Sequence, residues 1–252
     1  MTQFQLPRRI ERQYAKSIEN LILGLKSQLH GISSPILISE RIRRFARSPT
    51  FRATSAAIAR SMATHIFSDG HKTWRQAARA GSKGRYIYQA LQKELQGPVG
   101  SVYRQIVESN ADIIRSVPPQ IADRLSKRAA EVYESGLRGK SFESEIMALV
   151  PGMTAAHARL IARTETSKAG TALTEARARA VGLDWYVWRT SEDERVRDSH
   201  RLMEGVIIPW SEAPSPEKLN HEKSYGAYHA GNIFNCRCYP QPLIDYDDVS
   251  WP

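Results

Sequence analysis

Residues 185–210, WYVWRTSEDERVRDSHRLMEGVIIPW, decide the fold class of this chain. Successive residues of the segment DWYVWRT (184–190) point to opposite faces when extended, which predicts a β-strand with aromatic side chains on both faces. The charged segment SEDERVRDSH predicts a turn, and residues 205–210 predict a second strand. A small β-rich module is therefore expected over residues 184–242.

The sequence before this module has the three- and four-residue apolar spacing of helices. Glycine and proline residues divide it into separate segments. We expect helices over residues 7–29, 34–47 and 51–67, a short helix before a loop at 81–84, a helix from 99, and another starting at Pro118 and Pro119. After these we expect a short helix over 142–149, a turn at Pro151 and Gly152, a helix over 154–161, and then a long helix ending at Gly182. The predicted fold class is α+β, mainly helical in its N-terminal part and with a small β-containing C-terminal module.

The chain is long enough for two modest domains. We predict a basic helical region over residues 1–117 and a second domain over residues 118–252, with helices to about residue 182 and the β-rich module after them. An apolar content of 41% and a charged content of 25% predict an ordinary hydrophobic core. No run approaches the ~18–20 apolar residues of a membrane span, and no secretory leader is evident, so we expect a cytoplasmic protein without a membrane partner.

Positive charge is concentrated in the first third of the chain. Lys and Arg outnumber Asp and Glu by 17 to 5 over residues 1–96 and by 12 to 9 over residues 97–183, whereas acidic residues lead by 12 to 7 after that. Such an excess predicts a polyanionic partner, because clustered Lys and Arg release counterions from phosphate backbones. A solvated helix face, or a patch that docks an acidic protein, would show the same composition. The nucleic-acid-binding candidates are Arg41, Arg43, Arg44, Arg47, Lys72, Arg75, Arg79, Lys83 and Arg85.

Cys236 and Cys238 are the only cysteines, and their spacing cannot tie distant segments together. With His200 and either His229 or His221, their thiolates would make a tetrahedral zinc site. The C-x-C spacing argues against this, because in an extended strand the two sulfurs point to opposite faces. A labile disulfide and a pair of buried reduced thiols are the alternatives.

Two charged clusters have both a structural and a catalytic interpretation. Arg163 and Glu165 are expected near a helix start, as a capping and ion-pairing device. The charged turn is expected to be tied together by its ion pairs and hydrogen bonds; the residues concerned are Asp193, Arg195, Arg197 and His200. The catalytic alternatives are a toxin-like nuclease that uses His200 as a general base near Arg197 and Glu165, and a group-transfer enzyme that uses Arg163, Glu165 and His200. The chain lacks a recognisable pair of metal-binding carboxylates and a phosphate-binding glycine loop, which argues against enzymatic activity.

Four ordered motifs resemble the Mu F-like family of phage head-morphogenesis, or minor capsid, proteins. They are A-R-T-E at residues 162–165, D-x-R-x-R-x-x-H at residues 193–200, the glycine at 205, and N-C-R-C at residues 235–238, including Asn235. The resemblance covers roughly residues 118–242. Many relatives have a His-Pro pair just before N-C-R-C, whereas Ile233 and Phe234 occupy that place here. His229 lies only a few residues earlier.

The resemblance implies a minor head protein of a tailed phage or prophage, associated with the portal inside the procapsid and needed for head assembly. Its implied partners are portal, capsid or scaffold proteins and DNA. Its implied location is the virion interior, with the host cytoplasm during assembly. From the residues themselves we expect no enzymatic activity and no cofactor other than the zinc considered above. A nucleic-acid-binding module outside any virion would explain the charge but not the C-terminal motifs.

Overall fold

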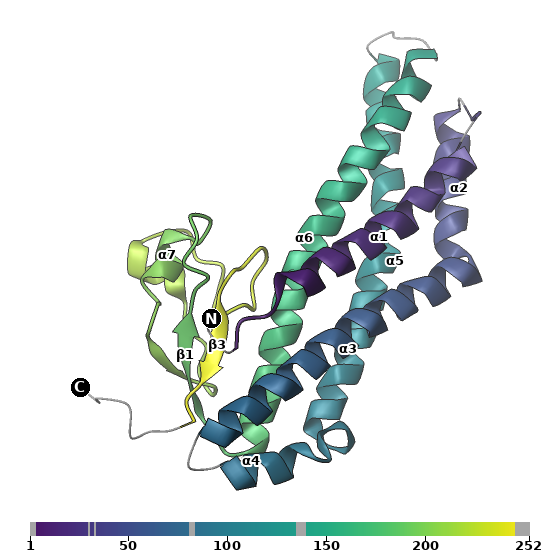
Figure 1. Cartoon of the computed structure of the whole chain (residues 1–252). Helices are drawn as coiled ribbons and strands as arrows, with labels where there is room; N and C mark the ends of the chain where they lie inside the picture. The colour runs from purple at the N-terminus through teal and green to yellow at the C-terminus, as the bar shows by residue number, and fades with distance from the viewer. Residues whose placement is uncertain (1–3, 30, 33, 81–83, 135–139, 245–252) are drawn as a thin grey trace. The chain divides into compact units, whose positions relative to one another are not determined.

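The computed structural model describes residues 4–29, 31–32, 34–80, 84–134 and 140–244, and it has the α+β architecture that the sequence predicts (Figure 1). The helical elements are α1 (Arg8–Leu29), α2 (Pro35–Arg47), α3 (Pro49–Ala80), α4 (Gly84–Leu91), the short 3-10 helix η1 (Glu94–Gln96), α5 (Pro98–Glu134), α6 (Lys140–Ala180), α7 (Asp198–Arg201) and the 3-10 helix η2 (Pro216–Asn220). The strands are β1 (Trp185–Arg189), β2 (Ile207–Pro209) and β3 (Tyr239–Pro242).

The chain forms two compact units, each assembled from separate segments. The first consists of Met1–Ile10, Met62–Ile106 and Arg163–Pro252, and the second of Glu11–Ser61 and Val107–Ala162. Helices therefore pass from one unit to the other. The predicted division of the chain after residue 117 falls within α5 and stays a prediction.

The second unit is a helical assembly held by apolar side chains at helical spacing. Its fully buried positions include Ile18, Ile22 and Leu25 of α1, Ile38 and Ile42 of α2, and Ile114 and Ile121 of α5. Each such side chain contributes about 1.5–3 kcal/mol when removed from water. A buried hydrogen bond from the Tyr14 hydroxyl to Asn110 Oδ1, 2.9 Å long, joins α1 to α5 and satisfies both polar groups.

The helices predicted over residues 7–29 and 34–47 are confirmed as α1 and α2, but three predicted breaks are wrong. First, α3 continues to Ala80 instead of ending near residue 67. Second, α5 continues through Pro118 and Pro119, where a new helix was expected. Third, α6 continues through the expected turn at Pro151 and Gly152. The expected loop at 81–84 lies mostly outside the described residues, and α4 begins at Gly84.

Three short antiparallel strands form the sheet, in the order β2-β1-β3. Tyr186 of β1 pairs with Ile208 of β2, and Trp188 pairs with Pro240 of β3. Both predicted strands are present, the second trimmed to three residues. The sequence did not predict β3, whose two prolines suit an edge strand because they need no partner for an N–H group.

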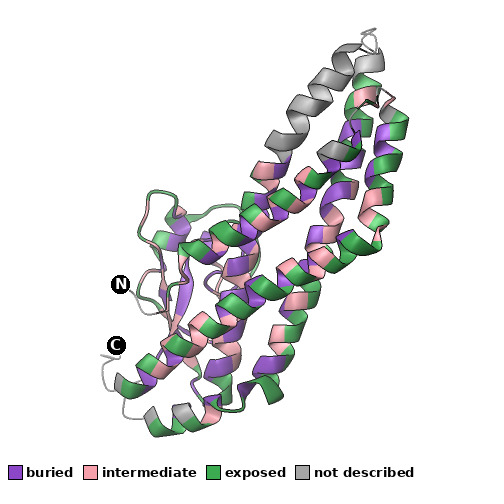
Figure 2. Ribbon diagram, turned by 45° about the vertical axis from the view of Figure 1, so that its right-hand side comes forward, coloured by how far each residue is buried: buried purple, intermediate pink, exposed green. Residues whose placement is uncertain are grey.

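One hydrophobic core joins this sheet to helices of the first unit, and its members come from α3, α4, α6, β1, β2 and the loops that lead to β3. The largest are Trp74, Ile87, Leu91, Tyr186, Trp188, Met203, Trp210 and Tyr228. Figure 2 shows buried residues along the strands and along one side of the helices. None of the helices in the described ranges combines the length and apolar character needed to cross a membrane.

Candidate functional site

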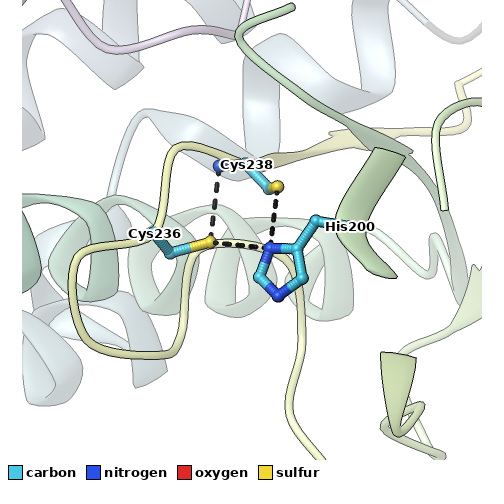
Figure 3. Close-up of side chains that lie close together, drawn as sticks. All are labelled: His200, Cys236 and Cys238. Carbon is cyan, nitrogen blue, oxygen red and sulfur yellow. Dashed lines mark hydrogen bonds between the residues drawn. The ribbon is translucent and has the colours of Figure 1, made fainter. Parts of the chain in front are cut away.

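Three metal-ligating side chains converge inside the C-terminal module. His200 comes from α7, while Cys236 and Cys238 come from the segment just before β3 (Figure 3). The distances from His200 Nδ1 are 3.6 Å to Cys236 Sγ and 3.3 Å to Cys238 Sγ. All three residues are at most 4% exposed. The three potential ligand atoms lie within 4.8 Å of one another, so a single small cation would reach all of them.

The backbone before β3 brings the two sulfurs together. Asn235 has a positive φ of 55°, which turns the chain, and the two cysteines lie outside the strand that begins at Tyr239. The Cys238 backbone N–H donates to Cys236 Sγ over 3.4 Å. The expectation that the sulfurs would point to opposite faces is therefore wrong, because it assumed an extended strand at a place where the chain turns.

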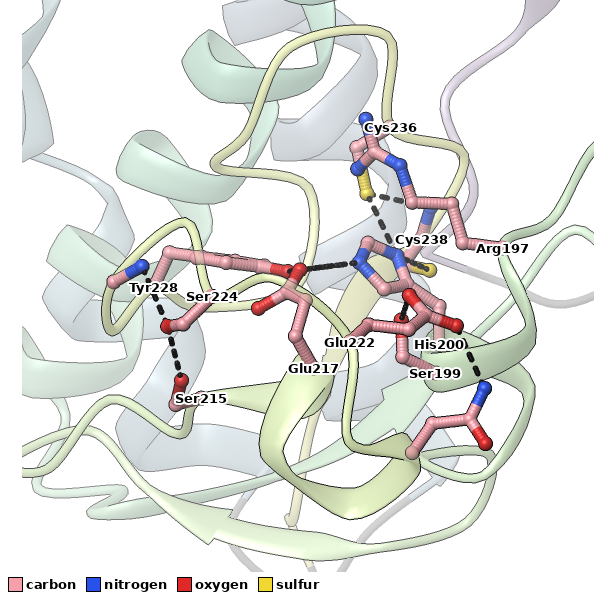
Figure 4. A network of polar contacts seen from close by, with 12 residues as sticks. Arg197, Ser199, His200, Ser215, Glu217, Glu222, Ser224, Tyr228, Cys236 and Cys238 are labelled. Atoms are coloured by element: carbon pink, nitrogen blue, oxygen red, sulfur yellow. Dashed lines mark hydrogen bonds and ion pairs between the residues drawn. The ribbon is translucent and has the colours of Figure 1, made fainter.

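A second polar layer holds the other side of the His200 ring (Figure 4). His200 Nε2 lies 3.0 Å from the Tyr228 hydroxyl, and that hydroxyl donates to Glu217 Oε1. Since the Tyr228 proton is used on Glu217, the proton between His200 and Tyr228 must come from His200 Nε2. In the neutral ring Nδ1 is then unprotonated, and its lone pair faces the two sulfurs.

The thiols of this cluster are electrostatically unequal. A hydrogen bond from the Cys238 thiol, assisted by His200, places the pKa of Cys236 well below its usual range despite burial. The same hydrogen bond, with burial, raises the pKa of Cys238. Burial, followed by the hydrogen bond to Glu217, raises the pKa of Tyr228. Without a cation the site therefore favours one thiolate, and a second would need positive charge nearby.

Motif residues that are far apart in the sequence meet around the cluster. Arg163 Nη1 donates to Asn235 Oδ1 over 2.9 Å, which joins the A-R-T-E motif to N-C-R-C. Arg237 Nη1 donates to Asp193 Oδ2 over 2.6 Å, which joins N-C-R-C to the charged turn. Burial alone would raise the pKa of Asp193, but the Arg195 backbone N–H and Arg237 outweigh it, so that pKa is lowered. The predicted tying of the turn thus runs largely through Asp193.

Other predicted site residues lie apart from the cluster. His229 Nδ1 is 3.1 Å from the Tyr186 hydroxyl, and burial lowers the pKa of this histidine. His229 is not a member of the group formed by His200 and the two cysteines. The third candidate histidine, His221, is exposed at the end of η2.

The catalytic alternative places His200 with Arg197 and Glu165, but each has other partners. Glu165 pairs with Lys168 on its own helix at 3.5 Å. Arg197 Nη2 donates to the Phe234 carbonyl over 3.0 Å. The expectation that Arg163 and Glu165 lie near a helix start is wrong, because α6 begins at Lys140 and both residues lie inside it.

Sequence reasoning missed the second layer of the site. Glu217 is 0% exposed although the residues around it, 215–224, are mostly polar. The only available signal was Pro216, which starts η2 and is itself buried. Tyr228 gave no signal beyond its place next to His229 in the sequence.

The basic candidates belong to both units. Arg41, Arg43, Arg44 and Arg47 are exposed on α2, in the second unit. In the first unit, Lys72, Arg79 and Arg85 are exposed and Arg75 is half-buried, while Lys83 lies outside the described residues. Arg43 is engaged by Asp123 of α5 at 2.8 Å.

Comparison with known proteins gives one family and one relative. Residues 121–240 match the family model described as "Phage Mu protein F like protein". A protein of Haemophilus influenzae with the name "Uncharacterized protein" is 32% identical over 143 residues, which is 57% of this chain and 30% of that protein. No solved structure matches the chain. The family segment runs from α5 to β3 and contains all the residues of the buried cluster and its second layer.

Proposed function

Because the chain belongs, through residues 121–240, to the Mu F-like family of phage proteins, we propose that it is a minor head protein required for phage head morphogenesis. The family match is the observation that carries this proposal. It is supported by the way the motif residues meet: Arg163 with Asn235, and Asp193 with Arg237. These contacts give the motif residues a common role in holding the C-terminal module together.

The proposal includes a place inside the procapsid, next to the portal and in contact with DNA or scaffold. The exposed arginines of α2 support the contact with DNA, because they follow one another on a single short helix. Phosphate backbones bind such groups independently of base sequence. An internal head protein needs this kind of binding, since the packaged DNA presents no fixed sequence to it.

The assembly role is tested in cells that carry the native locus or the same locus with this chain deleted. Mass spectrometry of purified particles is expected to find the protein at low copy number in heads. Electron microscopy of the deletion is expected to show malformed heads or a loss of infectious particles. Normal heads without the protein, together with its absence from wild-type particles, would contradict the proposal and favour the nuclease alternative, for which His200→Ala would be the next variant.

Contact with DNA is tested by removing three charges from α2, at Arg41, Arg44 and Arg47, through substitution with Gln. The matched control removes three exposed charges from α5 of the same unit, at Arg124, Lys127 and Arg128. If each α2 arginine touches a phosphate, the slope of log K against log salt falls by about 0.9 per residue. The control is expected to keep the wild-type slope, and equal losses in both variants would show that net charge, not α2, binds the DNA.

A further inference from the structure

We infer that Cys236, Cys238 and His200 Nδ1 form a zinc site that ties α7 to the segment before β3. This goes beyond the proposed role in head morphogenesis and does not depend on it. The site would be held by two thiolates and one imidazole, with a non-protein ligand such as water in the fourth position. Among the described residues, no further histidine, cysteine or carboxylate joins this group.

Two of the three separations between the ligand atoms match those around a tetrahedral zinc ion. Zinc binds sulfur at about 2.3 Å and imidazole nitrogen at about 2.0–2.1 Å, which places the two ligand atoms about 3.6 Å apart at a tetrahedral angle. The observed separations from His200 Nδ1 are 3.6 Å to Cys236 Sγ and 3.3 Å to Cys238 Sγ. Two thiolates and an imidazole are also the donors that favour zinc over magnesium or calcium.

The second layer is built as zinc sites require. A histidine that binds metal through one nitrogen almost always donates its other ring N–H to a carboxylate, a backbone carbonyl or water. Here His200 Nε2–H is directed to Tyr228, and Tyr228 to the fully buried Glu217. The buried Glu217, whose Oε2 has no partner within the described structure, is costly unless it balances positive charge nearby.

The small module also has reason to use a metal. Its strands contain five, three and four residues, and the chain between β2 and β3 has only the short helix η2 as regular structure. Strands this short are marginal unless other contacts hold their ends. A zinc ion would join two segments separated by more than thirty residues, as the residue numbers of His200 and Cys236 show.

The first test measures metal in the full chain, purified with a phosphine reductant and without chelators. Mass spectrometry of the metal content is expected to find one zinc per chain. Cobalt added after zinc removal is expected to give the strong visible bands of tetrahedral Co²⁺ and a thiolate-to-cobalt charge-transfer band. A chain that holds less than a tenth of an equivalent after zinc reloading, or that binds cobalt without thiolate bands, would overturn the inference.

Variants then assign the ligands. Cys238→Ser is expected to lose part of the thiolate bands and to weaken zinc binding at least a hundredfold. The control is His229→Gln, a change at a histidine outside the cluster, which is expected to keep the thiolate bands and the zinc affinity of the wild type. Circular dichroism reports whether each variant folds. An equal loss of zinc affinity in both variants would overturn the assignment of the ligands. If Cys238→Ser does not fold, the zinc content of the wild-type chain still tests the site.

Tyr228→Phe tests the positioning layer, because it removes only the hydroxyl that accepts from His200. Loss of a second-layer partner weakens metal affinity about 10–100-fold. Competition with a chelator is expected to show this loss while stoichiometry stays at one zinc per chain. Unchanged zinc affinity would overturn the positioning role of Tyr228, because it would show that the hydroxyl does not support His200 and that the residue only packs in the core.

Discussion

Arg177 is a fully buried charge in the helical core of the first unit. Its guanidinium binds Glu94 through Nε to Oε2 at 2.7 Å and through Nη2 to Oε1 at 3.2 Å. Arg177 Nη2 also donates to the Phe67 carbonyl over 3.0 Å, and His71 Nδ1 lies 2.8 Å from Glu94 Oε1. Gly70 makes room for this group, because a Cβ there would collide with Arg177 Nη1. The pair is thus enclosed, and removing the carboxylate of Glu94 would leave the buried guanidinium without an acidic partner.

Glu94→Gln is expected to lower the free energy of unfolding by about 3–5 kcal/mol, since it leaves the buried guanidinium uncompensated. The matched control is Glu175→Gln, which breaks a surface ion pair with Arg179. The side chain of Glu175 is 28% exposed and that of Arg179 is 51% exposed. That change should cost less than about 1 kcal/mol. Urea unfolding followed by circular dichroism measures both. A similar cost for the two variants would show that the buried pair contributes no more than a surface pair.

At the residue scale the sequence singled out the three side chains of the buried cluster but not how they meet. Cys236, Cys238 and His200 stand out by residue type and by the family motifs. Their convergence depends on the turn at Asn235. The residue pattern did not predict the positive φ of 55° at this position. The choice among the candidate histidines also depended on tertiary structure, because His229 is nearer to the cysteines in sequence and yet contacts Tyr186.

At the scale of elements, the loop before β3 packs against α6 through Gly231. Thr171 Oγ1 of α6 donates to the Ala230 carbonyl over 2.6 Å. Gly231 has a φ of +85°, and a Cβ there would lie 2.5 Å from Thr171 Oγ1 and 2.9 Å from Ser167 Oγ. This position therefore needs glycine for two reasons, its backbone conformation and its close approach to the helix.

Gly231→Ala is expected to destabilise the protein by about 2–4 kcal/mol, from positive-φ strain together with overpacking. Gly205→Ala is the matched control, because Gly205 has a φ of +79° and a methyl group added there would meet nothing within 4 Å. It should cost only the backbone term, about 1–2 kcal/mol. Thermal unfolding compares the two. A larger loss for Gly205→Ala would contradict the packing of the loop on α6.

The continuous α5 shows why proline is an unreliable helix boundary in a buried segment. Pro118 and Pro119 lack the N–H groups that the preceding turn would use, which favours a break. Yet the buried residues Ile114, Val117 and Ile121 keep helical spacing across the prolines. Burial of that apolar face outweighs the lost hydrogen bonds. The phase of the apolar positions on either side of a proline was the signal that the sequence offered.

At the scale of the whole molecule, the sheet is too small to provide a core alone. Its buried face packs with Trp74 and Ala78 of α3 and with Ile87 and Leu91 of α4. These residues precede residue 117, although the family match begins at residue 121. Local sequence patterns identified the helices and the strands separately. They could not reveal this long-range packing, because periodicity shows that a face is buried but not what covers it.

A fragment of residues 118–252 is therefore expected to fold poorly, although it contains the entire family segment. Without α3 and α4 the fragment would expose the apolar residues that Trp74, Ile87 and Leu91 cover. A protein with such exposed apolar surface binds hydrophobic dyes and lacks the fixed packing that makes unfolding cooperative. The full chain is the reference, and residues 1–117 added in trans should restore cooperativity if the missing packing is the cause. A fragment with a cooperative transition and little dye binding would instead establish the division after residue 117. The C-terminal core would then be stable without the helices that pack on it here, and the buried cluster would have to supply more of its stability.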